Sequence, residues 1–303
     1  MTGHRTPTDW FLFVLLATMW ASAFALTKIA VDGLPPGLIV TSRLAIASLI
    51  MAAVMVAQGE RLPPLSNRPA WKAIIGMGIF GTAAPFYLIT QGQRTIDSSL
   101  AALLISSAPL FVAAMAHFSF ADERLTWNKI TGILVGFAGV ALLLGPDALG
   151  GVGDAGVIAQ LLCLGGGFCY AVNTIIARGA PALPMIVLPT GFLTMATLAS
   201  LPAALLDDYS GFAPSVSNIG AVITLGAIPS AAAGVLMMHV VKTTSATFLS
   251  LTGYLIPVIS AILGYFAFGE VQDISAAAAF ALILGGVWLS QKQTAPPPIP
   301  RQP

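Results

Sequence analysis

The sequence predicts an all-α membrane protein in which ten transmembrane helices form two inverted repeats of five helices each. Three observations support this fold class. Of the 303 residues, 57% are hydrophobic and only 8% are charged, whereas about 25% of the residues in a soluble domain are charged. The apolar residues form runs that are long enough to cross a bilayer, and the second half of the chain repeats the first. Lipid must therefore face most of the surface.

A membrane-spanning helix needs about 20 mainly apolar residues, and ten segments meet this requirement. They cover residues 10–31, 37–57, 71–92, 98–119, 127–146, 155–177, 184–206, 217–241, 245–268 and 273–291. A signal peptide cleaved near Ala23 is the alternative for the first segment, but the apolar run continues to Val31. The tail at 294–303 is rich in proline and is predicted to be disordered.

The thirteen Lys and Arg residues predict the orientation of the chain. If both termini lie in the cytoplasm, ten of these residues are on the cytoplasmic side, and only Lys28, Arg43 and Arg94 are on the outer side. Cytoplasmic loops of membrane proteins carry an excess of positive charge. We therefore predict that both termini are cytoplasmic.

The second half of the chain repeats the first at an offset of 148 residues. Pro109 corresponds to Pro257, and Arg94 corresponds to Lys242. The same register holds over about a hundred residues, from the first helix to the fourth, which is more than chance similarity would produce. Duplication of a five-helix unit is the simplest explanation.

The two repeat units are predicted at 10–146 and 155–291. Because each unit has an odd number of helices, the second enters the membrane from the opposite side. Inverted repeats of this kind are typical of secondary transporters, whose solute site lies near the bilayer midplane between the halves.

The stretch WASAFALTKIAVDGLPPGLIVTSRL, which begins at Trp20, resembles the opening of the EamA repeat of the drug/metabolite transporter superfamily. In that pattern a Trp, a Phe and a Lys precede a Pro, and an Arg follows in the second helix. The residues at these positions are Trp20, Phe24, Lys28, Pro36 and Arg43.

The stretch SLAALLISSAPLFVAAMAHFSFADERLTWNKITGILVGFAGVALLL, which begins at Ser99, resembles the second half of the same repeat. Its matching residues are Pro109, Glu123, Arg124, Gly132 and Gly139. The second copy departs from the pattern, since Gly191 replaces Arg43 and Val271 replaces Arg124. The resemblance implies an exporter of amino acids or related metabolites in a bacterial inner membrane, without a cofactor.

Arg43 is the first candidate for a functional residue. It lies about 10 Å below the outer end of its helix, where a charge is costly and usually faces a cavity or a partner. Arg43 could attract the carboxylate of a solute. The structural alternatives are an ion pair with Asp32 or Asp97, or a side chain that reaches up to the outer surface.

Aromatic side chains gather near the predicted midplane together with hydroxyl and amide groups. Such a lining suits a small zwitterion with an apolar side chain, and the alternative is ordinary packing between helices. The predicted substrate-binding residues are Trp20, Phe24, Arg43, Tyr87, Gln91, Ser106, Tyr170, Asn173 and Tyr254.

Several function classes are disfavoured by what the sequence lacks. No Asp or Glu lies near the middle of any of the ten segments, so we favour facilitated diffusion or exchange over transport coupled to protons. The sequence has no Ser-His-Asp grouping and no metal-ligand cluster, so a membrane enzyme is disfavoured. A net charge of +1 gives no reason to expect a nucleic-acid partner. A multidrug exporter for hydrophobic cations remains the alternative.

Two further features predict how the helices bend and pack. Pro109 and Pro257 are predicted to bend helices four and nine, because proline removes one backbone hydrogen bond, and we expect them to act as paired hinges. Gly132 and Gly136 form a G-x-x-x-G motif that permits close helix packing. This motif could join helices five and ten within one chain, as expected for a monomer, or between two chains of a dimer.

Overall fold

The computed structural model describes residues 6–120, 126–144, 155–210, 212–244, 248–249 and 251–291. Within these residues all regular structure is helical, and no strand is present. Eight helices are long and apolar enough to cross a membrane, and two shorter apolar helices follow them. The predicted fold class, a multi-pass all-α membrane protein, is confirmed. The tail at 294–303 and the residues Glu123 and Arg124 lie outside the described part of the chain.

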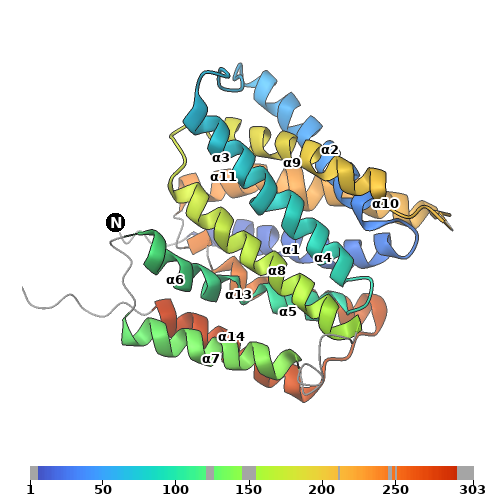
Figure 1. Cartoon of the computed structure of the whole chain (residues 1–303), viewed down its shortest axis with the longest axis vertical. Coiled ribbons are helices and arrows are strands. Elements are labelled where there is room, and N and C mark those ends of the chain that lie inside the picture. Colours follow the sequence, from blue (N-terminus) through green and yellow to red (C-terminus); the bar gives the residue numbers. More distant parts are fainter. Residues whose placement is uncertain are drawn as a thin grey trace, which may run out of the picture.

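Several helices are divided into parts, so the labels exceed the number of membrane segments (Figure 1). In chain order the elements are α1 (Pro7–Val31), α2 (Pro36–Ala57), α3 (Arg68–Gly78), η1 (Ile79–Ala83), α4 (Ala84–Gly92), α5 (Ser98–Ile105), α6 (Ala108–Ser119), α7 (Trp127–Leu144), α8 (Ala155–Arg178), α9 (Val187–Leu206), α10 (Val216–Leu225), η3 (Gly226–Ala232), α11 (Ala233–Thr243), α13 (Thr252–Phe268) and α14 (Ile274–Gln291). The elements η1 and η3 are π-helical.

Helix α1 begins earlier than the apolar pattern indicates, and a capping box explains why. The backbone N–H of Asp9 donates to the Thr6 hydroxyl at 3.2 Å, and the N–H of Thr6 donates to the Asp9 carboxylate at 2.9 Å. Pro7 occupies the first turn, where its missing N–H costs nothing. The helix continues without interruption past Ala23 to Val31, so this stretch is a structural part of the bundle.

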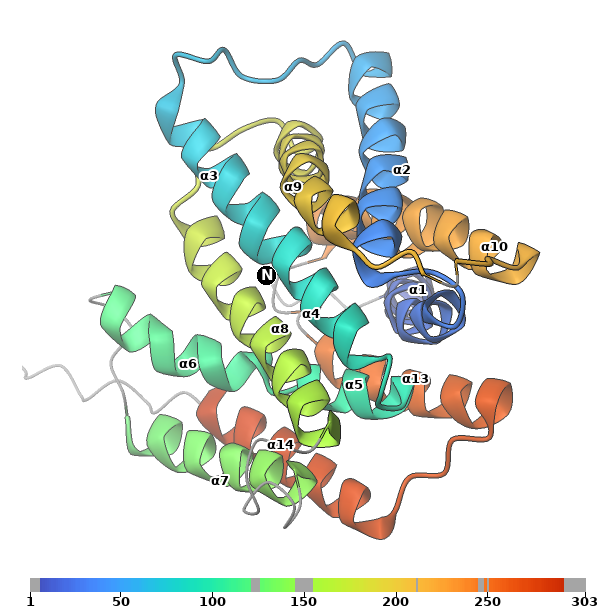
Figure 2. The same cartoon turned by 45° about the vertical axis from the view of Figure 1, so that its right-hand side comes forward.

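Helix contacts pair equivalent helices of the two predicted repeats. Helix α2 packs against its repeat counterpart α9, and α7 packs against its counterpart α14. Helix α1 of the first repeat contacts α13 of the second, and α8 of the second contacts α5 and α6 of the first in the same way. Figure 2 shows α7 and α14 together at one edge of the bundle, and α2 and α9 near the opposite edge.

The G-x-x-x-G motif packs within the chain. A Cβ atom added at Gly132 would lie 2.5 Å from the backbone oxygen of Gly286, and one at Gly286 would lie 2.5 Å from the backbone oxygen of Gly132. The backbones of α7 and α14 therefore touch where both residues lack a side chain. This contact confirms that the motif joins helices five and ten within one chain.

The third and eighth membrane segments, Arg68–Gly92 and Val216–Thr243, carry matching π-helical segments near their centres. Residues Ile79–Ala83 form η1, and Gly226–Ala232 form η3, which are related by the 148-residue offset. Pro85 follows η1 and Pro229 lies inside η3, and each proline deprives an earlier carbonyl of its usual N–H donor. Single π-helical turns inside α-helices occur frequently at functional sites.

Pro109 and Pro257, in the fourth and ninth membrane segments, have different local structures. Helix four is broken at Ser106–Ser107, and Pro109 lies in the first turn of α6. The hydroxyls of Ser106 and Ser107 donate to the carbonyls of Leu103 and Leu104 at 2.5 and 2.6 Å, which satisfies these acceptors at the break. Pro257 instead lies inside α13, which is continuous from Thr252 to Phe268. The paired hinge motion stays a prediction.

Glu270, in the connection between α13 and α14, holds the start of α5. Its carboxylate accepts hydrogen bonds from the backbone N–H groups of Ser98 and Ser99 at 2.9 and 3.0 Å, and from both of their hydroxyls. These groups are the free donors of the first helical turn, where negative charge is also favoured by the helix dipole. The second repeat thereby anchors the fourth helix of the first.

We expect this anchor to weaken in acid. Burial disfavours the charged carboxylate, but the hydrogen bonds from Ser99 and Ser98 prevail and hold the pKa of Glu270 below its ordinary value of 4.5. A carboxylate with a lowered pKa in the folded state stabilises the protein above its unfolded pKa, and this stability is lost as the pH falls through the folded pKa. The melting temperature of Glu270→Gln in detergent should be lower than that of the parent at pH 7, and the difference should shrink below about pH 4.5.

Glu60→Gln is the matched control, because the Glu60 carboxylate makes no hydrogen bond with any described residue. This variant should melt like the parent at both pH values. An equal deficit of Glu270→Gln at neutral and acidic pH would show that the carboxylate charge is not what anchors α5.

Candidate functional site: a central cavity with one cation

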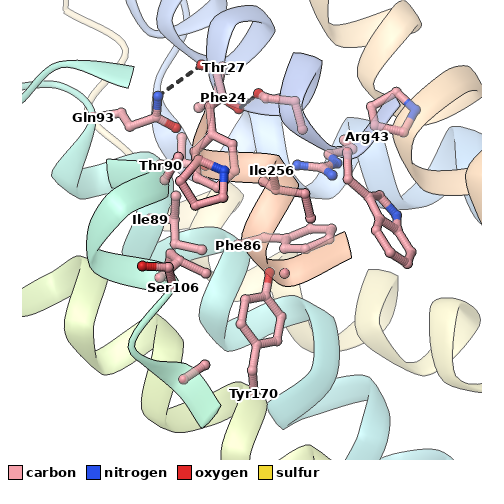
Figure 3. A pocket seen from close by; sticks show the side chains of 18 of the residues that line it. Phe24, Thr27, Arg43, Phe86, Ile89, Thr90, Gln93, Ser106, Tyr170 and Ile256 are labelled. Carbon is pink, nitrogen blue, oxygen red and sulfur yellow. Dashed lines mark hydrogen bonds between the residues drawn. The ribbon is translucent and has the colours of Figure 1, made fainter. Parts of the chain in front are cut away.

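A cavity of about 360 Å³ lies between the two repeats. It is bordered by α1, α2, α4, the break between α5 and α6, α8, η3 and α13, whereas α7 and α14 take no part in it. Its wall is mainly apolar and aromatic, and Figure 3 shows its side chains converging from several helices. The lining residues are Trp20, Ala23, Phe24, Thr27, Arg43, Phe86, Ile89, Thr90, Gln93, Ala102, Ile105, Ser106, Ala108, Pro109, Tyr170, Pro229, Gly253, Ile256 and Pro257.

Arg43 is the charged residue among the described residues of this lining. Its side chain projects from α2 and is only 8% exposed. The guanidinium carbon lies 3.9 Å from the ring centroid of Phe86, so the planar cation rests on an aromatic face. On the other side Nε donates to the Ser230 hydroxyl at 2.7 Å. Both contacts lie in or close to a π-helical segment, since Phe86 is in the first turn of α4 directly after η1 and Ser230 lies within η3.

Ser230 connects Arg43 to the backbone of η3, in the eighth membrane segment. Pro229 has no N–H, so it cannot donate to the carbonyl of Leu225 four residues earlier. The Ser230 hydroxyl donates to this carbonyl at 2.8 Å, and its oxygen accepts the bond from Arg43. The irregular backbone of η3 thus fixes the direction of the guanidinium.

Arg43 has no carboxylate partner in the described part of the chain. Asp97 forms an ion pair with Lys28 instead, with 3.9 Å between Nζ and Oδ1. No contact between Arg43 and Asp32 is present, and the low exposure of Arg43 rules out a side chain that reaches the surface. Both structural alternatives for Arg43 are therefore wrong. The N–H groups other than Nε have no acceptor among the described residues and remain open to the cavity.

Pro109 and Pro257 border this same cavity from the two repeats. In a regular α-helix their N–H groups would donate to the carbonyls of Ile105 and Gly253, four residues earlier, and proline cannot do this. Ile105 and Gly253 also line the cavity. Backbone that lacks regular hydrogen bonds is tolerated in a membrane where it borders a cavity, which explains why both repeats keep the proline at this place.

Five of the nine predicted substrate-binding residues line the cavity. They are Trp20, Phe24, Arg43, Ser106 and Tyr170. The first two lie on α1 and Tyr170 approaches from α8, opposite Arg43 (Figure 3). The aromatic groups and the cation that were predicted separately thus meet in one space.

The structure does not bring the other four to the cavity. The Gln91 amide donates to the Tyr87 hydroxyl at 2.9 Å, away from the lining, and Tyr87 packs on the apolar cluster between α2 and α9. Asn173 lies against the backbone of Gly81, and Tyr254 is not part of the lining either. Their depth in the membrane is suitable, but each successive residue turns about 100° around a helix, so depth alone does not determine which face they occupy.

Several lining residues are not among the predicted substrate-binding residues, although their spacing in the sequence indicates a shared helix face. On α1 the lining positions are 20, 23, 24 and 27, and on helix three they are 86, 89, 90 and 93. Positions 102, 105, 106 and 109 repeat the same spacing across the break in helix four. Residues with this spacing share one helix face, so extending the pattern from Trp20 and Phe86 would have found Thr27, Thr90 and Gln93.

The position and the chemistry of the cavity define the class of protein. A cavity between the two predicted repeats of membrane helices, lined by prolines and irregular backbone, is the arrangement expected of a solute transporter. The model of the EamA-like transporter family matches residues 9–145 and 157–291. The chain therefore belongs to the EamA-like transporter family.

Individual proteins are similar to this chain over nearly its whole length. A probable terminal-alkyne amino-acid exporter of Streptantibioticus cattleyicolor is 29% identical, over 93% of this chain and 92% of that protein. An S-adenosylmethionine/S-adenosylhomocysteine transporter of Chlamydia trachomatis is 25% identical, over 86% of this chain and 82% of that protein. One solved crystal structure matches with a TM-score of 0.60 at 23% identity, over 95% of this chain and 97% of the other, which shows the shared fold.

Proposed function

We propose that this transporter exports small neutral amino acids, above all those with apolar or aromatic side chains, by alternating access. The observation that carries the proposal is the state of Arg43. A buried cation that no described carboxylate contacts opens into a cavity whose lining is otherwise mainly apolar and aromatic. An ionisable residue inside the membrane marks a substrate pathway more often than a packing contact.

Arg43 and the aromatic wall divide the recognition of such a solute between them. The free N–H groups of the guanidinium suit a carboxylate, which they can bind in a bidentate manner. Trp20, Phe24, Phe86 and Tyr170 suit an apolar side chain. A volume of about 360 Å³ is near the lower end of the roughly 300–1,000 Å³ of ligand pockets, which favours a small solute.

The named relatives support a solute with an amino-acid group. The exporter of Streptantibioticus cattleyicolor is named for amino acids. The transporter of Chlamydia trachomatis is named for S-adenosylmethionine, and this molecule also carries an α-amino and an α-carboxyl group. The positive charge of Arg43 disfavours the alternative, an exporter of hydrophobic cations, because two cations in one apolar cavity repel each other.

The two repeats provide the mechanism for alternating access. Related halves can exchange conformations around a site between them, so that the cavity opens first to one side of the membrane and then to the other. No Asp, Glu or His is found among the described residues that line the cavity. We therefore propose facilitated transport or exchange, in which the gradient of the solute drives the movement.

Transport by the purified protein in liposomes tests this proposal. A labelled neutral amino acid such as phenylalanine should leave loaded vesicles down its gradient, and the rate should persist when the pH gradient is collapsed. Phenethylamine, which lacks the carboxylate, should be transported poorly. Loss of all transport without a pH gradient would refute the uncoupled mechanism, and preference for amines over amino acids would refute the substrate class.

The orientation in the cell is a separate part of the proposal. We propose that the protein lies in a bacterial inner membrane with both termini in the cytoplasm, since ten of its thirteen Lys and Arg residues would then face inward. A reporter that is active only outside the cytoplasm should be silent after Gln291 and active in the 147–154 connection. The reverse pattern would overturn the orientation.

A further inference from the structure

Gln93 presents an unsatisfied oxygen at the wall of the central cavity. The residue is completely buried at the C-terminal end of α4 and belongs to the lining. Its amide nitrogen donates to the backbone oxygen of Phe24 at 2.9 Å. The other atom of the amide, Oε1, is buried and has no hydrogen-bond partner among the described residues.

The orientation of this amide follows from its one hydrogen bond. The backbone oxygen of Phe24 can only accept, so the nitrogen of Gln93 must face α1 and the oxygen must face away from it. Figure 3 shows Gln93 and Arg43 on two sides of the same cavity, with Phe24 between them. The cavity wall therefore contains donors at Arg43 and a buried, unsatisfied acceptor at Gln93.

The fold itself does not require an amide at this position. At the 148-residue offset the counterpart of Gln93 is Val241, at the end of helix eight. The equivalent position of the other repeat thus holds an apolar residue. A buried acceptor without a donor destabilises a protein, so its presence in only one repeat points to a role that the fold does not explain.

The surroundings of Gln93 favour a donor that carries positive charge. The C-terminal end of a helix has a partial negative charge that attracts cations, and Gln93 follows the last residue of α4. The nearby cation Lys28 is already engaged by the backbone oxygen of Ile96 at 3.4 Å and by Asp97 at 3.9 Å. It therefore leaves the Gln93 oxygen free.

We infer that Gln93 Oε1 accepts a hydrogen bond from the ammonium group of the transported amino acid. This inference rests on the proposed function and extends it, because it makes Gln93 the residue that distinguishes an amino acid from a simple carboxylic acid. Arg43 binds the carboxylate, Gln93 binds the ammonium, and the aromatic wall holds the side chain. A solute without an N–H group leaves the Gln93 oxygen unpaired and is bound less well.

A pair of ligands tests the inference on the wild-type protein. Phenylalanine and 3-phenylpropionate differ by the amino group, and the affinity of each is measured on purified full-length protein in nanodiscs. Phenylalanine should bind about tenfold tighter or more, as expected for a hydrogen bond to a charged group. Equal affinities would overturn the inference without any variant, and a wild-type protein that binds neither ligand would instead overturn the proposed function.

Two substitutions complete the test. Gln93→Met keeps the length of the side chain but removes the acceptor, so the preference for phenylalanine should disappear while 3-phenylpropionate binds as before. Gln160→Met is the control, since Gln160 Oε1 is also buried and unpaired but lies outside the cavity lining. It should keep the wild-type preference. If Gln93→Met weakens both ligands equally, or changes neither, Gln93 has only a structural role and the inference is wrong.

Discussion

Arg43→Gln should reduce the transport of a neutral amino acid by roughly thirtyfold or more, while the protein remains folded. Truncating one partner of a buried, hydrogen-bonded charge pair costs about 2–5 kcal/mol, and each 1.4 kcal/mol is about a factor of ten. In the proposed mechanism this pair forms between Arg43 and the carboxylate of the solute, since no described carboxylate contacts Arg43. The rate of phenylalanine efflux from liposomes measures the effect.

Stability measured without solute separates the two possible roles of Arg43. A cation that lacks a carboxylate counter-ion is costly to bury, so Arg43→Gln should melt at the same temperature as the parent or higher. If Arg43 were structural, its loss would lower the melting temperature and impair all transport through misfolding. Arg94→Gln is the control, since Arg94 is exposed at the end of helix three, and it should retain parental transport. Efflux near the parental rate in Arg43→Gln would remove the basis of the proposed substrate class.

Gly286→Val should destabilise the protein strongly, because the seam between α7 and α14 has no room for a side chain. A Cβ at Gly286 would lie 2.5 Å from the backbone oxygen of Gly132 and 2.5 Å from the backbone nitrogen of Gly136. Backbone atoms cannot turn aside as a flexible side chain can, so the helices must separate. Overpacking of a well-packed interior costs about 1–3 kcal/mol and occasionally more. The melting temperature and the monodisperse fraction in detergent measure this loss.

Gly285→Val is the matched control on the same helix. A Cβ at Gly285 has no heavy atom within 4 Å, and the residue is exposed on the outer face of α14. The same change in sequence and helix propensity should therefore have little effect one residue away. Equal stability of the two variants would mean that α7 and α14 do not pack along this seam.

The two repeats share a fold but contribute different chemistry to the cavity. Arg43 on α2 corresponds to Gly191 on α9, where a Cβ would lie 2.9 Å from the side chain of Ile74. At Gly191, in the second repeat, the neighbouring helix fills the space that a side chain would need, whereas at Arg43, in the first repeat, that space holds the side chain. The polar groups that we assign to the solute, Arg43 and Gln93, both belong to the first repeat, while Tyr170 and Pro229 come from the second.

The sequence by itself determined the fold class and much of its organisation. Few charges and ten long apolar runs indicate a bundle of membrane helices. Backbone polar groups in lipid must be satisfied within helices or a closed barrel, and unbroken apolar runs of about 20 residues match a helix. The offset that aligns Pro109 with Pro257 indicated the inverted repeat. A cation within the membrane was visible as Arg43 from its position in the second segment. These properties are local or periodic, so they can be read along the chain.

Only the tertiary structure decided which side chains face the cavity. Tyr87 follows Phe86 directly, yet Phe86 supports the Arg43 guanidinium while Tyr87 packs between α2 and α9. One step along a helix turns a side chain by about 100°, and the π-helical segments η1 and η3 shift this phase further. The sequence pattern does not reveal such a shift, because it arises from the fit between helices.

The partners of the polar groups also depended on the tertiary structure. Ser230 is distant from Arg43 in the sequence, and Gln93 reaches the backbone of Phe24 on another helix. Whether a buried donor or acceptor is satisfied depends on what the packed helices bring within about 3 Å of it. Among the described residues the Arg43 guanidinium has no carboxylate partner and the Gln93 amide oxygen has no donor. Both conditions are properties of the folded bundle, and these two groups define the proposed site.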